Sequence, residues 1–425
     1  MIPLRFIRQH QEAVRQGLLD KGMAGDGLDE ILALDEQLRE QVTQVESLKA
    51  RRNQVSQEVG RLKQAGRSAE AQVKAMGAVS LEIKALDQAV HALQEKVDQR
   101  LLWLPNLPHP SVPVGPGASA NRVVATVGDP VRHSFQAQDH LSLLENLNLV
   151  DFEAGARIAG RGFPVYIGRG ARLERALINF MLDLHTREHG YTEIYPPFLA
   201  TRKATQTTGQ LPKLEEDMYV TTTDDLFLIP TAEVPITNMF QGQIIPEDDL
   251  PLSFVAFSAC FRREAGSYGK ETKGLLRLHQ FNKVELVKFV HPDTSYVELE
   301  TVRAHAEEVL RRLGLTYRVV ELCSGDLSFA AAKCYDLELY APAMDSWLEV
   351  SSCSNFEAFQ ARRGQIRFRR NDTGKLNYIH TINGSGVATP RLMVALLESG
   401  QQRDGSVVLP QALVPYYGEE TVVPL

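Results

Sequence analysis

The sequence is poor in cysteine and has no long hydrophobic run. Its four cysteines are Cys260, Cys323, Cys334 and Cys353, and no two of them form a C-x-x-C pair. A disulfide framework and a structural zinc site are therefore not expected, and we predict that the cysteines are small buried apolar residues. No apolar stretch reaches the ~20 residues that span a membrane, and residues 1–8 lack the apolar core of a signal peptide. We expect a soluble, cytosolic protein.

A strong net charge is also missing. The formal net charge is -7 at pH 7, from 46 basic and 53 acidic residues, so any surface that binds nucleic acid must be local. No G-x-G-x-x-G motif follows an early strand, which argues against a dinucleotide-binding fold. With 425 residues, of which 44% are hydrophobic and 23% charged, the chain is long enough for at least two globular domains.

Residues 28–104 differ from the rest because their apolar side chains recur at alternating steps of three and four. The first series is Ile31, Leu34, Leu38, Val42, Val45, Leu48, Val55, Val59 and Leu62, and the second is Val73, Met76, Val79, Ile83, Leu86, Val90, Leu93, Val97 and Leu104. A period near 3.5 is typical of helices that wrap around each other. Residues 64–68 lack apolar side chains and include Gly66, so we predict an antiparallel two-helix hairpin, the arm.

Basic residues gather around the predicted tip of the arm. Seven lie between positions 49 and 74, namely Lys49, Arg51, Arg52, Arg61, Lys63, Arg67 and Lys74. Only Glu58 and Glu70 oppose them in that range, whereas acids dominate residues 26–46. A solvated charged face explains this pattern as well as an RNA contact does. If the partner is RNA, these cations would neutralise phosphates and the contact would be sensitive to salt.

Proline and glycine then end the helical pattern. Residues 104–117 read L-P-N-L-P-H-P-S-V-P-V-G-P-G, a composition that cannot continue a helix. We predict a domain boundary here, with an N-terminal helical domain at residues 1–110 and a second domain at residues 111–425.

The second domain contains a predicted long hairpin. We expect strands at residues 254–263 and 278–287, joined by a polar loop with Gly266, Gly269 and Gly274. Four side chains of this hairpin can converge on one face, namely Arg262, Glu264, Phe281 and Glu285. An arginine suits a carboxylate or a phosphate, a phenyl ring suits a purine, and a glutamate can accept from an exocyclic amine. The set fits a nucleotide, although R-x-E alone is more often a solvated strand pair.

Two further segments supply residue types that suit a nucleotide or a small polar substrate. Thr231 and Glu233 stand in T-A-E between two prolines, a tripeptide with almost no motif value alone. Glu349 and Ser352 fall on a predicted strand at residues 346–355, and their hard oxygens could hold magnesium together with nucleotide phosphates. A partly buried strand with satisfied hydroxyls is the plain alternative.

A third segment, T-I-N-G-S-G-V-A-T-P-R, predicts a strand up to Gly386 and a helix from about Pro390, with Arg391 in its first turn. Glycines let the backbone approach a ligand, and a cation at a helix N-terminus suits phosphate. An ordinary turn at N-G-S-G is the alternative. We also predict helices at residues 139–151 and 172–189 and a mobile polar loop over a site at residues 203–217.

Taken in order, these motifs resemble those of class II aminoacyl-tRNA synthetases, and specifically the seryl-tRNA synthetase family. F-R-x-E, followed after a basic loop by H-x-F-x-K-x-E, matches the second class motif, which holds ATP in a bent shape. Residues 190–199, G-Y-T-E-I-Y-P-P-F-L, match the first motif, which forms the dimer interface. The resemblance implies an α+β body around an antiparallel sheet with flanking helices, an N-terminal antiparallel coiled-coil arm, and a homodimer.

The resemblance implies that L-serine is activated with ATP and Mg²⁺ and then transferred to the 3′ end of tRNA(Ser), with tRNA(Sec) as a further candidate. The implied catalytic residues are Arg262, Glu349 and Arg391. The implied serine site comprises Thr231, Glu233, Arg262, Glu285, Asn383 and Ser385. The implied ATP site comprises Arg262, Arg263, Glu264, Arg277, Phe281, Glu349, Val350, Ser351, Ser352 and Arg391, with the metal on Glu349 and Ser352. The seven basic residues of the arm would bind tRNA.

One departure and two alternatives remain. Thr389 and Pro390 stand where the third class motif has a further glycine, which leaves the backbone near Arg391 open. A related ligase could load an amino acid onto a carrier protein, but such relatives lack the long arm. A non-enzymatic coiled-coil scaffold is the other alternative, and the retained Arg262, Glu264 and Phe281 argue against it.

Overall fold

The computed structural model describes residues 1–265 and 273–424, so Gly266 and Gly269 of the predicted loop lie outside the described residues. The chain divides into two compact units. One comprises residues 2–19 and 23–105, and the other comprises residue 1, residues 20–22 and residues 106–425. Among the described helices, none is long and apolar enough to cross a membrane.

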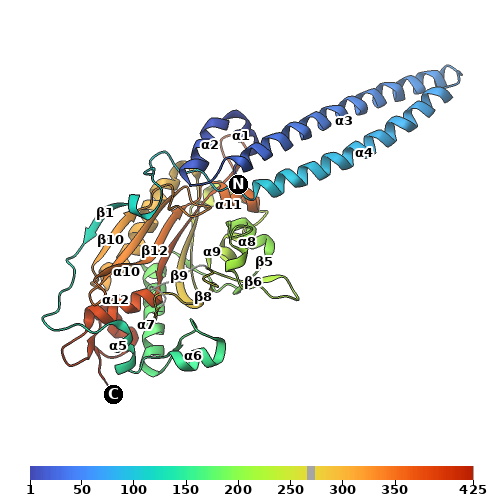
Figure 1. The fold of residues 1–425 in the computed structure, drawn as a ribbon. Helices are drawn as coiled ribbons and strands as arrows, with labels where there is room; N and C mark the ends of the chain where they lie inside the picture. The colour runs from blue at the N-terminus through green and yellow to red at the C-terminus, as the bar shows by residue number, and fades with distance from the viewer. Residues whose placement is uncertain (266–272, 425) are drawn as a thin grey trace. The chain divides into compact units, whose positions relative to one another are not determined.

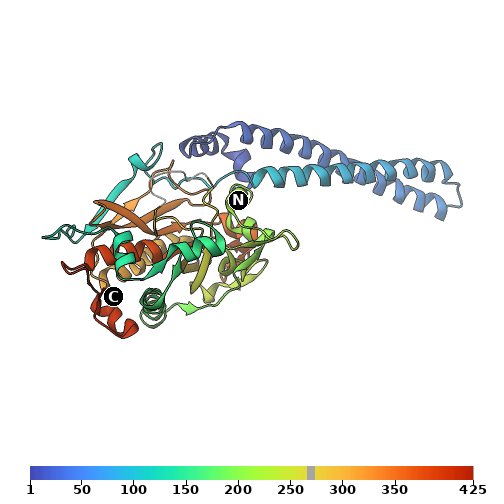
Figure 2. The same cartoon turned by 60° about the horizontal axis from the view of Figure 1, so that its bottom comes forward.

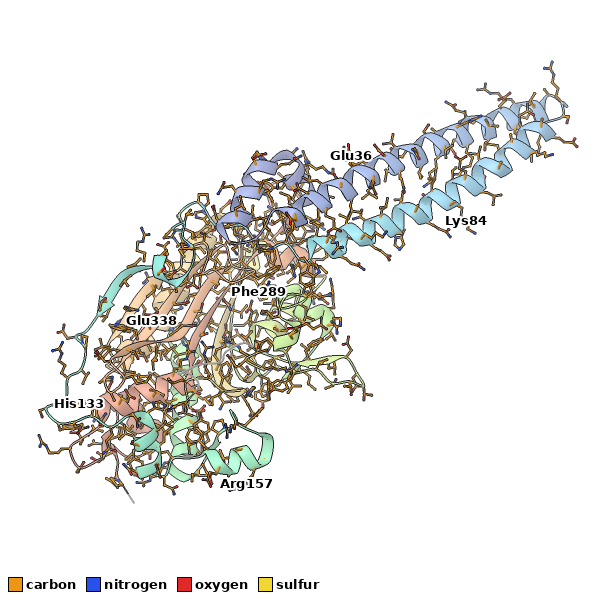
Figure 3. All side chains as sticks on the ribbon, in the orientation of Figure 1. Glu36, Lys84, His133, Arg157, Phe289 and Glu338 are labelled. Atoms are coloured by element: carbon orange, nitrogen blue, oxygen red, sulfur yellow. The ribbon has the colours of Figure 1, made fainter. Side chains whose placement is uncertain are left out.

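The first unit is helical and contains the predicted arm (Figure 1). Its helices are α1 (Leu4–Gln9), α2 (Gln11–Asp20), α3 (Asp26–Gln64) and α4 (Glu70–Leu101). Helices α3 and α4 form an antiparallel pair, with Gly66 at φ +70° in the turn between them. Most of the predicted seam is buried or half-buried, but Val73 is 50% exposed, and its neighbour Gln72 is half-buried instead. Glu36 and Lys84 stand out from α3 and α4 into solvent (Figure 3).

The second unit is built on one large, mostly antiparallel sheet (Figures 1 and 2). Its strands, in spatial order, are β1 (Arg122–Val127), β10 (Tyr317–Glu321), β11 (Lys333–Ala341), β12 (Ser346–Asn355), β15 (His380–Ala388), β9 (Gln280–Val290), β8 (Leu252–Phe261) and β4 (Thr192–Glu193). All neighbours are antiparallel except β4 and β8. The α+β class with a helical arm is therefore confirmed.

Helices and small sheets surround this sheet. The helices are α5 (His140–Asn146), α6 (Phe152–Ala159), α7 (Gly168–Arg187), α8 (Arg202–Thr208), α9 (Glu233–Asn238), α10 (Ser295–Arg312), α11 (Phe359–Gly364), α12 (Thr389–Gly400) and α13 (Val414–Tyr417). Single 3-10 turns are η1 (Ala118–Ala120), η2 (Glu215–Asp217), η3 (Glu247–Asp249), η5 (Pro292–Thr294) and η6 (Gln411–Leu413). The short strands are β2 (Val150–Asp151), β3 (Val165–Tyr166), β5 (Leu199–Thr201), β6 (Leu226–Leu228), β7 (Ile244–Pro246), β13 (Arg367–Arg369), β14 (Leu376–Tyr378), β16 (Val407–Val408) and β17 (Thr421–Val422).

Strand β9 lies between two hydrophobic cores, and its alternate side chains point into one or the other. Val284 and Leu286 face the main core, to which α7, α10 and α12 contribute their apolar sides. Val287 and Phe289 face a second core under the small sheet of β7, β13 and β14, and Phe289 lies within the packed side chains of the body (Figure 3). Successive residues of a strand point to opposite faces. Further along the same face as Phe289, β9 therefore presents Phe281, Lys283 and Glu285.

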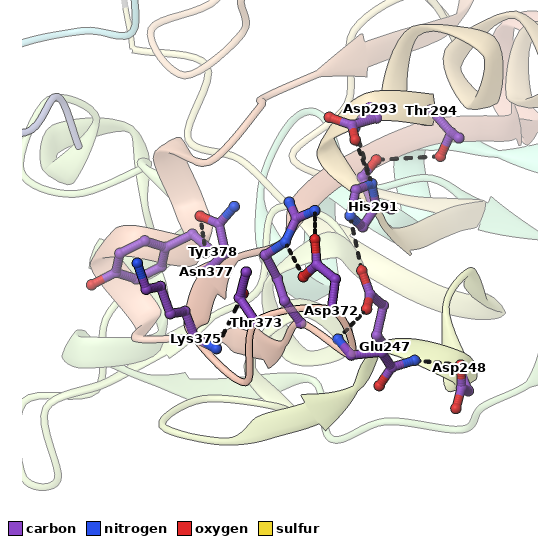
Figure 4. Close-up of polar contacts among 12 residues, drawn as sticks. Glu247, Asp248, His291, Asp293, Thr294, Asp372, Thr373, Lys375, Asn377 and Tyr378 are labelled. Carbon is purple, nitrogen blue, oxygen red and sulfur yellow. Dashed lines mark hydrogen bonds and ion pairs between the residues drawn. The ribbon is translucent and has the colours of Figure 1, made fainter.

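Polar contacts tie the small sheet to the end of β9 (Figure 4). His291 Nε2 lies 3.2 Å from the Glu247 carboxylate, which also accepts from the backbone N–H of Asn371 at 2.6 Å. Beside them, Arg370 and Asp372 form an ion pair at 2.8 Å. The strand that bears the predicted site residues is thus anchored beyond its last residue.

Two predicted elements differ from the structure. The helix predicted at residues 139–151 ends at Asn146, because Asn148 adopts a left-handed conformation at φ +50° and the chain then enters β2. The loop predicted at residues 203–217 begins as helix α8, whose N-terminus is capped by the Thr201 side chain, which accepts from Ala204 N. The four buried cysteines are unpaired, as predicted.

Candidate active site

The body contains a cavity of about 470 Å³ beside β9, β12 and β15. Thirteen of the predicted site residues line it, namely Thr231, Glu233, Arg262, Glu264, Arg277, Phe281, Glu349, Val350, Ser351, Ser352, Asn383, Ser385 and Arg391. Among the described residues that line the cavity, Arg263 and Glu285 are absent. Arg263 is exposed, and Glu285 lies fully buried behind the wall.

The hairpin of β8 and β9 positions the groups predicted to hold the nucleotide. Arg262 and Glu264 follow the end of β8, and Glu264 has a left-handed backbone at φ +53°. The Arg262 guanidinium carbon lies 5.2 Å from the centroid of the Phe281 ring, which is cation–π distance. Arg277 Nη1 lies 3.1 Å from Glu264 Oε2. A flat ring, two cations and a carboxylate therefore share one end of the cavity.

Arg391 also lines the cavity and joins two of its segments. Its Nη1 donates to the carbonyl of Glu349 at 2.7 Å, and its Nε donates to the carbonyl of Leu276 at 3.1 Å. The same guanidinium lies 3.5 Å from the Glu349 carboxylate. The arginine thus joins β12 to Leu276, which precedes β9 in the hairpin. It also places a positive charge in the first turn of α12.

Thr389 fills the place where the class motif has a glycine. Its hydroxyl lies within hydrogen-bond distance of the buried Glu174 carboxyl on α7 and of the Asn282 carbonyl on β9. Asn282 Nδ2 also donates to Glu174 at 2.8 Å, and burial raises the pKa of Glu174. The departure from the family pattern therefore joins α7, β9 and α12 through one polar cluster.

The glycines of N-G-S-G lie within β15, so the plain-turn alternative is wrong. An added Cβ at Gly384 would lie 2.4 Å from Val302 of α10, and one at Gly386 would lie 2.8 Å from His185 of α7. These glycines admit the close packing of two helices, a role that the sequence analysis did not assign to them. The residues between them, Asn383 and Ser385, face the cavity.

A buried polar network lines the end of the cavity nearest Thr231. Asn383 Nδ2 donates to Glu233 Oε2 and to Glu285 Oε1, both at 3.1 Å. Lys283 Nζ lies 2.5 Å from Glu285 Oε2. Burial, followed by the nearby Glu285 carboxylate, raises the pKa of Glu233 to about 7. The network offers both acceptors and donors to a small zwitterion.

Thr231, Ser351 and Ser385 complete this end. The Thr231 hydroxyl accepts from the backbone N–H of Glu233 at 3.3 Å. Ser385 Oγ lies 3.5 Å from Glu285 Oε2, and its carbonyl accepts from Ser351 Oγ at 2.6 Å. Glu285 therefore reaches the cavity through Asn383, Ser385 and Lys283.

Lys283 lines the cavity, but the sequence analysis assigned it no function. The signal was present, because positions 281, 283 and 285 of a strand share one face. Other lining residues were also missed, among them Gly209 of the segment after α8 and Phe329 of the segment before β11. The sequence analysis placed the loop at residues 203–217 over a site but gave Gly209 no role, and no motif marked the segment of Phe329.

The predicted metal ligands, Glu349 and Ser352, both belong to β12 and line the cavity. The Glu349 side chain is 50% exposed, and Ser352 Oγ lies 3.1 Å from Cys334 Sγ. Burial, and next the Glu349 carboxylate, raises the pKa of Asp336 on the neighbouring strand well above its usual range. Within the described residues, no group of three or more His, Cys, Asp or Glu side chains could hold a metal. These hard oxygens fit a magnesium ion that takes its remaining ligands from phosphates and water.

The arm carries the predicted tRNA-binding residues. Lys63, Arg67 and Lys74 line a hollow at the turn between α3 and α4. Lys49 forms an ion pair with Asp87 of α4 at 2.9 Å. The other three, Arg51, Arg52 and Arg61, lie on α3.

Comparison with known proteins agrees with this architecture. Residues 216–400 match the model of the tRNA synthetase class II core domain (G, H, P, S and T), and residues 1–108 match the seryl-tRNA synthetase N-terminal domain. The fold and the site are those of a class II aminoacyl-tRNA synthetase. The chain is 50% identical to a serine–tRNA ligase of Geobacter sulfurreducens over 98% of this chain and 99% of the relative. The chain belongs to the seryl-tRNA synthetase family.

Further relatives support the same assignment. A serine–tRNA ligase of Pelotomaculum thermopropionicum is 51% identical over 98% of this chain and 99% of the relative. The crystal structure of seryl-tRNA synthetase from Pyrococcus horikoshii complexed with ATP superposes with a TM-score of 0.95 at 35% identity, covering 100% of both chains. Neither the carrier-protein ligase nor the scaffold alternative is supported by these matches.

Proposed function

We propose that the cavity activates L-serine with ATP and then transfers the seryl group to tRNA(Ser). The observation that supports this most directly is the buried network of Glu233, Asn383, Glu285 and Lys283 beside Arg262 and Phe281. It joins a pocket for a small zwitterion to a platform for a nucleotide. We further propose that residues 111–425 contain this activity and that residues 1–110 contribute the tRNA-binding arm.

In the first step a serine carboxylate oxygen attacks the α-phosphorus of ATP, and the bond to the β-phosphate oxygen breaks. The nucleophile is already an anion, so the protein needs no general base, and catalysis is mainly positioning and charge stabilisation. Arg262 would bridge the serine carboxylate and the α-phosphate. Phe281 would stack on adenine, and Glu264 would accept from its amino group. Arg277 and Arg391 would neutralise the leaving pyrophosphate.

Magnesium would be held by Glu349 and Ser352 together with the phosphates, and it would add positive charge where pyrophosphate leaves. In the second step the seryl group passes from the adenylate to the 3′ end of tRNA, and AMP is the leaving group. The seven basic residues of the arm would bind the long variable arm of the tRNA through its phosphates. Use of tRNA(Sec) stays a prediction from the family resemblance.

Selection of serine would depend on the polar partners of its hydroxyl and ammonium groups. Glu233, Thr231 and Ser385 lie at the cavity wall, with Glu285 behind them. Alanine would leave buried groups without a partner, and a site built to bond a hydroxyl rejects the analogue that lacks it by about 10⁴-fold. A separate editing site is therefore unnecessary against alanine.

The test is ATP–pyrophosphate exchange with serine, threonine, alanine and glycine. We expect exchange with serine and a kcat/KM at least about 100-fold lower with each of the others. Equal exchange with alanine or glycine would contradict the assignment of the pocket. Serine exchange without transfer to tRNA(Ser) would instead contradict the second step.

A further inference from the structure

One wall of the cavity is a segment without regular secondary structure. Ser328, Phe329 and Ala330 line the cavity, and residues 328–332 lie between the end of β10 and the start of β11 in neither helix nor strand. The carbonyls of this wall segment therefore have no partners from a strand ladder. Buried carbonyls must find donors elsewhere.

Lys21 supplies donors to this wall. Its Nζ lies 2.9 Å from the carbonyl oxygen of Ser328, 2.7 Å from that of Ala331 and 3.5 Å from that of Phe329. Burial lowers the pKa of Lys21 to about 7. An ammonium in such surroundings is stabilised by hydrogen bonds to carbonyls, and these bonds fix where the carbonyls lie.

Asn106 and His109 supply the remaining donors. The Asn106 backbone N–H donates to the Phe329 carbonyl at 2.9 Å, and its Nδ2 donates to the Ala330 carbonyl at 3.0 Å. The His109 backbone N–H donates to the Ala332 carbonyl at 2.8 Å. Every carbonyl from residue 328 to residue 332 thus accepts from residue 21, 106 or 109. In sequence, these donors directly flank the arm helices, since α3 begins at Asp26 and α4 ends at Leu101.

The wall segment touches the serine end of the cavity. An added Cβ at Gly209 would lie 3.1 Å from the Ala330 side chain and 3.8 Å from the Phe329 ring. The carbonyl of the preceding Thr208 accepts from Gln360 Nε2 at 3.1 Å, and the same amide contacts Glu233. These contacts connect the wall to Glu233 through Gly209, Thr208 and Gln360.

We propose that Lys21, supported by Asn106, is a positioning residue that sets the affinity of the site for serine by fixing the wall segment 328–332. The proposal rests on the proposed function, since it concerns the serine end of the same site. Lys21 touches no reacting group and acts through the backbone of the wall. The segments that enter and leave the arm thereby contribute to the shape of the active site.

The test uses the whole 425-residue chain with Lys21→Met, which keeps an unbranched side chain one atom shorter and removes the donors. We expect the KM for serine in pyrophosphate exchange to rise about tenfold, with the KM for ATP within about twofold. In the absence of substrates, hydrogen exchange of a peptide spanning residues 323–335 should be faster in Lys21→Met than in the wild type. Lys375→Met, at an exposed lysine of the same unit (Figure 4), is the control. It should change neither the KM for serine nor the hydrogen exchange of this peptide. Lys21→Arg, which restores a cationic donor, should recover most of the serine affinity.

Asn106→Ala is the second variant, because it removes the Nδ2 bond to Ala330 and keeps the backbone bond to Phe329. We expect faster hydrogen exchange of the same peptide than in the wild type, and a smaller rise in the serine KM than in Lys21→Met. The proposal would be overturned if Lys21→Met had the hydrogen exchange and the KM values of the wild type. It would also be overturned if the KM for serine and the KM for ATP rose equally. Failure of the wild-type protein to exchange with serine would overturn the proposed function instead, and the hydrogen-exchange comparison would still judge the wall.

Discussion

Opposite charges are packed closely around the pocket that we assign to serine. Glu233 and Glu285 are buried, and Lys283 and Arg262 supply the neighbouring positive charges. A buried charge is tolerated only where a partner and hydrogen bonds compensate for lost water. Removing one member should therefore disturb the others, which makes single substitutions informative at the residue scale.

Glu285→Ala should cripple serine activation and largely spare adenine binding. The substitution leaves Lys283 buried without its counter-ion and removes an acceptor from Asn383. Breaking a buried pair in this way lowers the free energy of unfolding by about 3–5 kcal/mol. We expect serine-dependent pyrophosphate exchange to fall at least about 100-fold, while ATP binding measured by calorimetry changes less than twofold. Glu300→Ala on α10, 46% exposed at its side chain, is the control. Unchanged exchange in Glu285→Ala would refute the assignment.

Serine binding should weaken in acid because the pKa of Glu233 is raised to about 7. Below that pH the carboxyl is protonated and cannot pair with the serine ammonium, so the KM for serine should rise up to about tenfold per pH unit.

The raised pKa of Glu233 also makes the stability of the fold depend on pH. The folded state binds this proton more tightly than the unfolded chain does, so the contribution of Glu233 to stability falls as pH rises from 4.5 to about 7.

The control for this profile is Glu233→Gln, which cannot ionise. Its serine KM should be high at pH 8 and nearly flat between pH 6 and pH 8. A profile in Glu233→Gln that matched the wild type would assign the titration to another group.

At the scale of elements, the site depends on how strands and helices meet. Strand β9 alternates between site and core, and Gly384 and Gly386 of β15 let α10 and α7 pack closely behind Asn383 and Ser385. The Thr389–Glu174–Asn282 cluster joins the start of α12 to β9 and α7. The position of Arg391 should therefore depend on a threonine that touches no substrate.

Thr389→Val should destabilise the protein and weaken ATP binding. The substitution keeps the shape and leaves Glu174 short of a buried partner, which costs about 1–3 kcal/mol of unfolding free energy. Thr301→Val, at a half-buried position of α10 where the hydroxyl donates to the Val297 carbonyl of the same helix, should stay within about 0.5 kcal/mol. Urea unfolding and the Kd for ATP measure the two effects. Equal values for both variants would mean that the cluster does not hold Arg391.

Local patterns predicted the elements better than their ends. The strand at residues 346–355 has the predicted bounds. The strands predicted at residues 254–263 and 278–287 lie at residues 252–261 and 280–290, so Arg262 follows β8 instead of lying within it. Helix α8 was missed because its threonines have low helix propensity, and capping by Thr201 together with packing compensates for that deficit.

At the scale of the whole molecule, two activities are assigned to different parts of the chain. Residues 28–104 form the arm, and the cavity lies in the second unit. The structure brings the ends of the arm together, since an added Cβ at Gly27 would lie 4.0 Å from Leu104. A short flexible linker can therefore join residues 27 and 105, with Lys21 and Asn106 retained.

Deletion of residues 28–104 should leave serine activation intact and abolish charging of tRNA. The cavity and the donors to its wall remain, whereas the seven basic residues are lost. Pyrophosphate exchange and aminoacylation measure the two steps separately. Efficient charging of tRNA(Ser) by the shortened protein would contradict our account of the arm.

The protein should form a homodimer through the sheet edge at β4, as the resemblance to the first class motif implies. Strand β4 is a short edge strand, and Tyr195 just beyond it is 77% exposed, which is typical of an interface anchor. Light scattering should give twice the mass of the chain, and Tyr195→Asp should shift the protein towards monomer. Val297→Asp, at another exposed apolar residue, should not. A monomeric wild type would contradict the prediction.

The sequence by itself determined the arm, the strands of the site and the types of residue that meet there. Those features leave local traces, such as a period near 3.5, a period of 2, or a cation beside a glycine-rich strand. Only the tertiary structure decided that Glu285 lies behind Lys283, that Thr389 bonds to α7, and that Lys21 holds the wall at residues 328–332. These contacts join residues far apart in the chain, and packing of that kind leaves no periodic pattern to read.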